Sequence, residues 1–248
     1  SLILKKEYLA QVESGILQKD PDQLKIVEIL ESLSEKIATD GILEDIKGLF
    51  KKSSNSLEGV YIYGGVGRGK TMLMDLFFDS VGTEKKIRQH FHRFMQSIHA
   101  RLAELSGKTD PLGIVVSELE RDYDLICFDE FYVEDIGDAM LLGRSLEKLL
   151  ASKVKMVFTS NIKPSELYMG GLQRKSFLSA ISAIENHCEI NCLESVTDYR
   201  LRELEKSGIY FSPIDSEKIS SFKKLFLQLS KGANSGQSTI DILGRKIA

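Results

Sequence analysis

The segment that most constrains the fold is glycine-rich and lies between an apolar run and a helical pattern. Residues 64–71 read GGVGRGKT, the apolar run Val60–Tyr63 precedes them, and the helical pattern starts at Met72. This is a P-loop, or Walker A, pattern. Its glycines allow positive φ and close approach to a phosphate, so that backbone N–H groups and a helix N-terminus converge on the anion. The pattern predicts a strand, a phosphate-binding turn and a helix.

The P-loop residue types also predict a cofactor, ATP with Mg²⁺. Lys70 would bring a point charge to the β and γ phosphates, and the Thr71 hydroxyl would complete the shell of a Mg²⁺ that bridges them. The residues expected to contact the nucleotide are Gly64, Gly65, Val66, Gly67, Arg68, Gly69, Lys70, Thr71 and Met72.

A second motif follows about 60 residues later. The apolar run Leu125–Phe128 ends in Asp129 and Glu130, which is a Walker B pattern. A buried strand would carry both acids to the sheet edge where α/β proteins bind ligands. We expect Asp129 to hold Mg²⁺, directly or through water, and Glu130 to orient and deprotonate the attacking water. The alternative is a pair of acids that only caps the next helix.

The next apolar strand, Val154–Phe158, ends in Thr159-Ser160-Asn161. A polar residue at the tip of the strand beside Walker B can touch the γ-phosphate or the attacking water. We assign this sensor-1 role to Asn161. Together these segments predict the α/β class, a P-loop NTPase with a doubly wound parallel sheet and an AAA+-like core.

The patterns in the rest of the sequence predict how the chain is divided into domains. Residues 1–57 are expected to form a helical N-terminal extension and linker, with Asp20 and Pro21 starting its main helix. Residues 58–213 are the expected ATPase core, and residues 214–248 begin a C-terminal lid with a helix over 216–230. The chain starts with Ser1 and stops at Ala248 just after a strand-like run, 239–243, so we expect a longer protein whose lid is truncated here.

Segment 86–91 is expected to be a second strand, on which His90 and His92 would share one face. Such a pair is a conceivable metal site, but it has no nearby third ligand, and a polar contact at a strand end is the simpler interpretation. Phe91, Phe94 and neighbouring apolar residues are expected in the core. Segment 187–193 is a fifth strand, with both of its cysteines on one face for packing.

Composition excludes some classes of protein. The 248 residues are 42% hydrophobic and 28% charged, as in an ordinary globular chain of one large or two small domains. The formal net charge of -3 gives no reason to expect a nucleic-acid partner. The chain has no apolar run of the ~18 residues that span a bilayer, and its three cysteines form no Cys-x-x-Cys pair, so we expect a cytoplasmic protein.

Several stretches more specific than a P-loop resemble one family, the ZapE cell-division ATPases and their mitochondrial relatives, which are AAA+-like. The stretches that carry the resemblance are GGVGRGKT at 64–71, HFHRFM at 90–95, CFDEF at 127–131, TSN at 159–161, LY at 167–168, GLQR at 171–174 and DYR at 198–200. The resemblance runs from the N-terminal helices to about residue 213.

The resemblance implies an ATPase that works as a homo-oligomer when it is full length and nucleotide-bound, and that remodels a protein partner. In bacteria this partner would be the tubulin-like FtsZ at the division ring near the inner membrane, and a peripheral membrane contact stays open. In such a ring Arg174 could act on the neighbouring subunit's γ-phosphate as an arginine finger. Arg93 and Arg144 are rivals for this role, and Arg174 could instead pair with Glu166 on its own surface.

Two other classes of function remain as alternatives. A P-loop kinase or GTPase switch is disfavoured because Glu130 follows the Walker B aspartate and no Asn-Lys-x-Asp guanine-reading motif is present. A nucleotide-loaded binding module or assembly switch with little turnover is the other alternative, and multiple-turnover phosphate release would separate it from an ATPase.

Overall fold

The fold is a parallel β-sheet covered by helices on both faces. The computed structural model describes residues 3–46, 58–193, 240–242 and 245–247. Residues 1–198 form one compact unit and residues 199–248 a second. The predicted α/β class is confirmed. The predicted boundary at 213 and the predicted helix 216–230 lie outside the described residues and stay predictions.

The sheet has five parallel strands in the order β2-β3-β4-β1-β5. The strands are β1 (Gly59–Tyr63), β2 (Lys86–His90), β3 (Leu125–Asp129), β4 (Lys155–Ser160) and β5 (Cys188–Cys192). The central strands β1, β3 and β4 are almost completely buried, as continuous apolar runs in parallel sheets are. The register pairs Tyr63 with Ser160 and His90 with Asp129, so the carboxyl ends of four strands meet at one edge.

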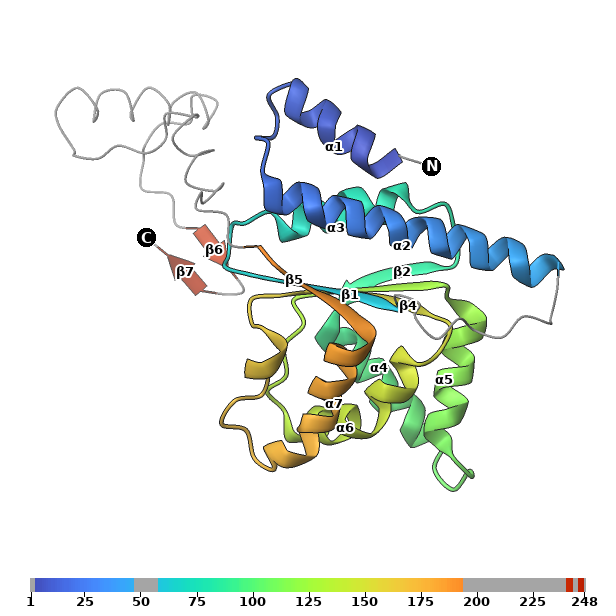
Figure 1. Cartoon of the computed structure of the whole chain (residues 1–248). Coiled ribbons are helices and arrows are strands. Elements are labelled where there is room, and N and C mark those ends of the chain that lie inside the picture. The colour runs from blue at the N-terminus through green and yellow to red at the C-terminus, as the bar shows by residue number, and fades with distance from the viewer. Residues whose placement is uncertain (1–2, 47–57, 194–239, 243–244, 248) are drawn as a thin grey trace. The chain divides into compact units, whose positions relative to one another are not determined.

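One face of the sheet is covered by α1 (Ile3–Glu13), α2 (Pro21–Ile46) and α3 (Lys70–Ser80), drawn above the sheet in Figure 1. Their apolar side chains and those of the strands form one buried cluster, which includes Tyr8, Val27 and Phe77. The N-terminal segment is helical as predicted, and it belongs to the same compact unit as the sheet. Asp20 caps α2, because its Oδ1 accepts from the N–H groups of Asp22 and Gln23 at 2.9 and 3.3 Å.

The other face is covered by helices drawn below the sheet in Figure 1. They are α4 (Phe91–Glu104), α5 (Pro111–Asp122), α6 (Ile136–Leu150) and α7 (Arg174–His187), with the short 3₁₀ turn η1 (Pro164–Glu166) before α7. Phe91, Phe94, Met95 and Ile98 are buried in this layer, as predicted. In the second unit, β6 (Ile240–Ile242) and β7 (Arg245–Ile247) form an antiparallel pair, which confirms a strand near 239–243.

One local prediction is wrong. The strand β2 ends at His90, and α4 begins at Phe91, so His90 and His92 do not share a strand face. The apolar residues 91, 94, 95 and 98 have helical rather than alternating spacing, and this period decides the local structure. Among the described residues, no group of three or more His, Cys, Asp or Glu side chains could hold a metal ion on its own.

Candidate active site

The P-loop joins β1 to α3 in the predicted place, and its backbone explains the glycines. Gly64 and Gly69 have φ of 152° and 93°. A Cβ at Gly64 would lie 2.3 Å from the carbonyl oxygen of Leu193, and a Cβ at Gly69 would lie 2.8 Å from Nε2 of Gln23. Because the Leu193 backbone cannot give way as a side chain can, Gly64 requires glycine for space as well as for φ, whereas at Gly69 a Cβ would displace the Gln23 side chain and φ favours glycine.

Lys70 is the first residue of α3, and its side chain folds back over the loop. Its Nζ donates to the carbonyl oxygens of Gly64 and Gly65 at 2.7 and 2.8 Å. Thr71 is exposed in the first turn of the same helix, where backbone N–H groups have no helical partner. The loop thus presents an ammonium group, a hydroxyl group and a helix N-terminus in one place, which suits a polyphosphate.

The Walker B aspartate is held by an arginine that sequence reasoning missed. Arg88 Nε donates to Asp129 Oδ2 at 2.6 Å, and Arg88 Nη2 donates to Asp129 Oδ1 at 3.3 Å. Arg88 Nη1 also donates to Asp75 on α3. The register pairs Arg88 with Cys127, so Asp129 is its diagonal neighbour on the same face of the sheet.

The arginine and the aspartate are both largely buried, with 18% and 17% of their side chains exposed. Burial lowers the pKa of Arg88, but the hydrogen bonds to Asp129 and Asp75 outweigh it and raise that pKa above its ordinary value. Arg88 is therefore a fixed positive charge beside the expected metal ligand.

Glu130 follows Asp129 with a left-handed backbone, at φ 54°. A non-glycine residue in this conformation carries strain that the surrounding structure must offset. The adjacent strand β4 does this: Phe131 N–H donates to the Thr159 carbonyl at 2.7 Å, and Ser160 Oγ donates to the Phe131 carbonyl at 2.8 Å. The turn therefore directs the Glu130 side chain, 81% exposed, outward, where its Oε2 lies 3.8 Å from Nδ1 of His90.

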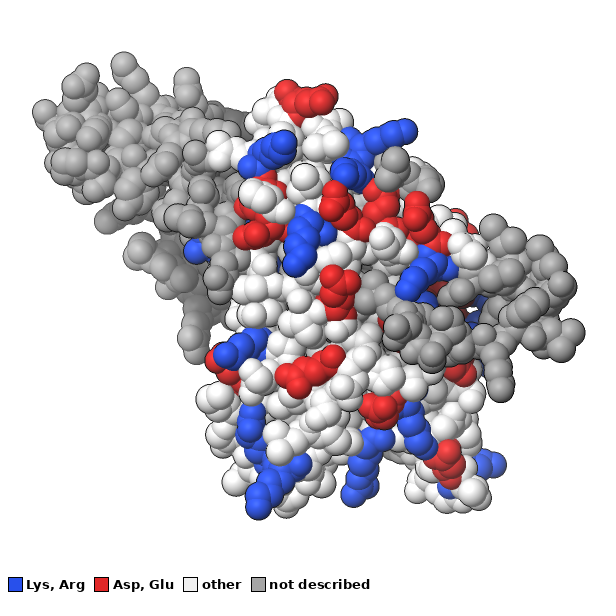
Figure 2. All heavy atoms as spheres, in the orientation of Figure 1, with Lys and Arg blue, Asp and Glu red and all other residues white. Residues whose placement is uncertain are grey.

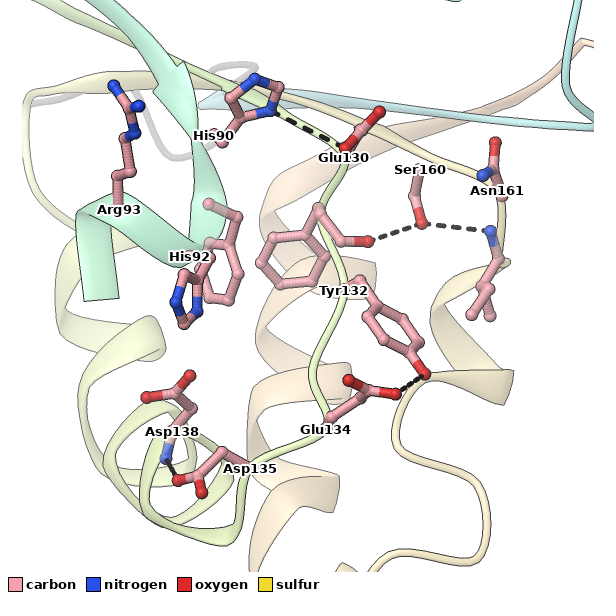
Figure 3. Close-up of a pocket in the computed structure, with 13 residues that line it drawn as sticks. His90, His92, Arg93, Glu130, Tyr132, Glu134, Asp135, Asp138, Ser160 and Asn161 are labelled. Carbon is pink, nitrogen blue, oxygen red and sulfur yellow. Dashed lines mark hydrogen bonds and ion pairs between the residues drawn. The ribbon is translucent and has the colours of Figure 1, made fainter. Parts of the chain in front are cut away.

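Glu130 and Asn161 line one cavity of about 810 Å³ at this edge, together with His90. In Figure 3, Glu130 and Asn161 project from neighbouring strand ends, and the ring of His90 faces Glu130. The cavity continues past Phe91 and Phe131 toward Asp135 and Asp138 at the start of α6. The structure therefore brings the expected base and the expected sensor to the same opening.

Arg174 begins α7, after η1 and a tight loop. Its Nη2 donates to the Ser165 carbonyl at 2.8 Å, and its buried Nε has no hydrogen-bond partner. Glu166 pairs with Lys163 at 3.1 Å. The ion pair between Arg174 and Glu166, considered as an alternative from the sequence, is not formed. Arg93 and Arg144 are both exposed.

The donor set fits Mg²⁺ bound together with a nucleotide. This ion keeps several waters and takes one or two protein oxygens plus phosphate oxygens, so a hydroxyl and one carboxylate suffice. Thr71 would supply the hydroxyl, and Asp129 would supply the carboxylate at the carboxyl edge of the sheet. Both oxygens of Asp129 accept from Arg88, which leaves the carboxylate oriented rather than free to rotate.

On the face shown in Figure 2, Lys and Arg side chains are interspersed with Asp and Glu over the described residues, without a large area of one sign. Within the described part of the chain, no helix has both the length and the apolar character to cross a membrane.

Comparisons with known proteins agree with the geometry. A family model described as AFG1-like ATPase matches residues 2–248. The chain is 41% identical over 254 residues to cell division protein ZapE of Escherichia coli strain K12, which covers 98% of the chain and 68% of that protein. It is 38% identical over 204 residues to lactation elevated protein 1 homolog B of Danio rerio, covering 77% of the chain and 41% of that protein.

Among solved structures, AMPPCP-bound DnaA from Aquifex aeolicus shares the fold. Its TM-score is 0.51 at 16% identity, and the match covers 87% of the chain and 65% of that structure. At this identity the likeness concerns the fold alone.

Proposed function

Because the chain belongs to the AFG1-like ATPase family and is an ATPase, we propose that it hydrolyses ATP at the carboxyl edge of its sheet. The observation that carries this proposal is that the P-loop, Asp129 and Glu130 all follow or end strands at one edge of the sheet, where Glu130 and Asn161 line one cavity. Lys70 and the loop N–H groups bind the β and γ phosphates. Thr71 and Asp129 hold Mg²⁺, which supplies positive charge to the phosphate oxygens when bound.

Glu130 is the proposed general base. Its exposed carboxylate projects from the end of β3, which β4 separates from the P-loop strand β1, and can accept a proton from the attacking water. Asn161 orients that water or the γ-phosphate through its amide. The two groups come from neighbouring strands whose ends are joined by the hydrogen bonds of Thr159 and Ser160, so their spacing is fixed before ligand binds.

The test compares two variants with different expected defects. Lys70→Ala should abolish ATP binding, because Lys70 contributes ground-state charge. Glu130→Gln should keep binding and lower kcat by about 10²- to 10⁴-fold, the usual contribution of a general base. Glu134→Gln is the matched control, because its carboxylate accepts from Tyr132 at 2.7 Å in the same loop. Wild-type turnover by Glu130→Gln would refute the assignment of the base, and multiple-turnover phosphate release excludes a binding module.

We propose further that hydrolysis drives remodelling of a protein partner in cell division. The support is the 41% identity to a protein named cell division protein ZapE, and the partner expected from the family resemblance is FtsZ. The action would then take place at the division site. Glu130→Gln loaded with ATP should retain the partner in a pull-down, and the wild type should change the amount of sedimenting FtsZ polymer only with ATP. An unchanged polymer fraction at equimolar protein would contradict FtsZ as the partner.

We propose that Arg174 acts in trans on the neighbouring subunit's site. The loop before it exposes two large apolar side chains, Met169 (68%) and Leu172 (74%), as expected of a surface that another subunit covers. Arginine fingers contribute about 10³- to 10⁵-fold in rate in other P-loop enzymes. Arg174→Ala mixed with Lys70→Ala should regain part of the activity that each lacks alone. If subunits exchange and no mixing ratio restores activity, Arg174 does not work across an interface.

A further inference from the structure

A buried glutamine connects the N-terminal helices to the P-loop. Gln23 lies in the first turn of α2 and is 1% exposed. Its Nε2 donates to the carbonyl oxygen of Arg68 at 3.2 Å, and the same Nε2 lies 2.8 Å from where a Cβ of Gly69 would be. The side chain therefore packs directly against the peptide between Arg68 and Gly69.

A tyrosine from α1 fixes the orientation of this glutamine. Tyr8 is fully buried, and its hydroxyl donates to Oε1 of Gln23 at 3.2 Å and accepts from the N–H of Asp20 at 3.3 Å. With Oε1 used as an acceptor, the amide must present Nε2 to the loop. Both ends of a fully buried amide are thus engaged, one by α1 and one by the P-loop.

The first helix is itself held firmly on the second. The N–H groups of Leu4 and Lys5 donate to the two carboxylate oxygens of Glu31 at 3.2 and 3.1 Å, and Glu31 is only 5% exposed. Leu4 is buried in the same cluster as Tyr8. Because α1 is anchored at both Leu4 and Tyr8, the position of the Tyr8 hydroxyl depends on the docking of the whole helix.

The geometry of the peptide unit gives this contact a consequence for phosphate binding. In a trans peptide the C=O and the following N–H point in opposite directions. When Gln23 holds the Arg68 carbonyl on the α2 side, the N–H of Gly69 is turned to the opposite side of the loop. Gly69 has φ of 93° and directly precedes α3, so its N–H is one of the donors that an anion at this helix N-terminus would use.

We propose that Gln23 is a positioning residue of the nucleotide site: with Tyr8, it sets the Arg68–Gly69 peptide so that the Gly69 N–H faces the phosphates. Nucleotide affinity then depends on the docking of α1 and α2. This inference rests on the proposed binding of nucleotide phosphates by the P-loop. Loss of the contact removes the side-chain donor from a partly buried carbonyl and frees the peptide to rotate.

The test uses the full chain and calorimetric titration with ADP, pyrophosphate and adenosine. Gln23→Met keeps the shape of the side chain but cannot donate, so ADP and pyrophosphate should both bind about tenfold more weakly, which corresponds to 1.4 kcal/mol. Adenosine affinity should not change, because adenosine has no phosphate. Tyr8→Phe should weaken ADP binding in the same direction by a smaller factor. If Gln23→Met does not fold, Gln23→Leu replaces it, since leucine is apolar, of similar size and lacks the donor.

Val27→Ala is the matched control for lost stability. Val27 is fully buried in the same helix and cluster but contacts the core rather than the loop. The Val27→Ala substitution should lower Tm and leave the Kd for ADP unchanged. If the wild type binds no ADP, the proposed nucleotide site is wrong. If the wild type binds and Gln23→Met binds within twofold of it, or if Val27→Ala weakens ADP equally, Gln23 does not position the loop.

Discussion

Removal of Arg88 should both destabilise the chain and disable the proposed metal ligand. Arg88→Met preserves much of the side-chain volume and deletes the guanidinium that donates to Asp129 at 2.6 and 3.3 Å. Asp75 also loses a donor, but 55% of its side chain is exposed, and water can replace Arg88 there. Asp129 is 17% exposed, so the main cost arises at the Walker B aspartate.

The size of the effect follows from burial. Hydrogen bonds to charged groups contribute about 1.5–3 kcal/mol each, and breaking a fully buried ion pair costs about 3–5 kcal/mol. Since a little less than a fifth of each side chain is exposed to solvent, we expect Arg88→Met to lower the free energy of unfolding by about 2.5 kcal/mol. For a unit of this size that lowers Tm by about 5–10 °C. ATP turnover should fall about 10- to 100-fold, as when groups that orient a metal ligand are removed.

The assay is a double-mutant cycle of Arg88→Met, Asp129→Ala and both together, with unfolding followed by urea titration. Arg88→Met should lower the free energy of unfolding more than Asp129→Ala does, because Arg88 still pairs with Asp75 when Asp129 is removed. Arg121→Met is the control: Arg121 pairs with Asp122 at 2.7 Å, but both are exposed and screened by solvent, so a much smaller loss of stability than for Arg88→Met is expected. A coupling between Arg88 and Asp129 no larger than this control would refute the reasoning.

Three further results are expected. Lys155→Met should lower the free energy of unfolding by about 3 kcal/mol, because it removes the partner of Glu58 at 2.7 Å in a buried pair; a change below 1 kcal/mol in urea titration would contradict this. Gly171→Ala should displace the Tyr168 ring, which lies 2.3 Å from the added Cβ, and a lower Tm checks it; an unchanged Tm would show that the ring moves freely. Burial raises the pKa of the Cys127 thiol above the unfolded value of about 8.5. Above that pH the unfolded state gains free energy by ionising the thiol and the folded state does not, so the free energy of unfolding should fall as the pH rises past about 8.5. Iodoacetamide at a pH of about 8.5 should label Cys127 only in urea.

Local patterns predicted much of the fold and the positions of the strands and the loop that carry the candidate site. The strand positions follow from continuous apolar runs, and the P-loop follows from a local glycine pattern, with positive φ at Gly64, Gly67 and Gly69. The start of α2 was predictable, because Asp20 and Pro21 form a local capping signal. Each of these depends on residues within one turn or one strand.

Contacts between elements that lie far apart in the sequence could not be predicted from it. Arg88 reaches Asp129 only because β2 pairs with β3 in one particular register, 41 residues apart. Gln23 reaches the P-loop across 45 residues, through helices whose apolar faces could pack on many partners. The error at His90 and His92 was of another kind: the helical spacing of Phe91, Phe94 and Met95 was readable in the sequence and contradicts a strand there.

These contacts hold the P-loop peptide and the Glu130 turn from different elements. The P-loop peptide is held from α2 by Gln23, whereas Asp129 is held from β2 by Arg88 and the Glu130 turn from β4. The Gln23 support lies in the cluster on the α1–α3 face, and the side chains that flank Glu130 on the cavity, Phe91 and Phe131, belong to the cluster on the opposite face. A change in α1 docking should therefore alter phosphate affinity without moving the base. A change at the cavity should alter turnover at saturating ATP without altering affinity.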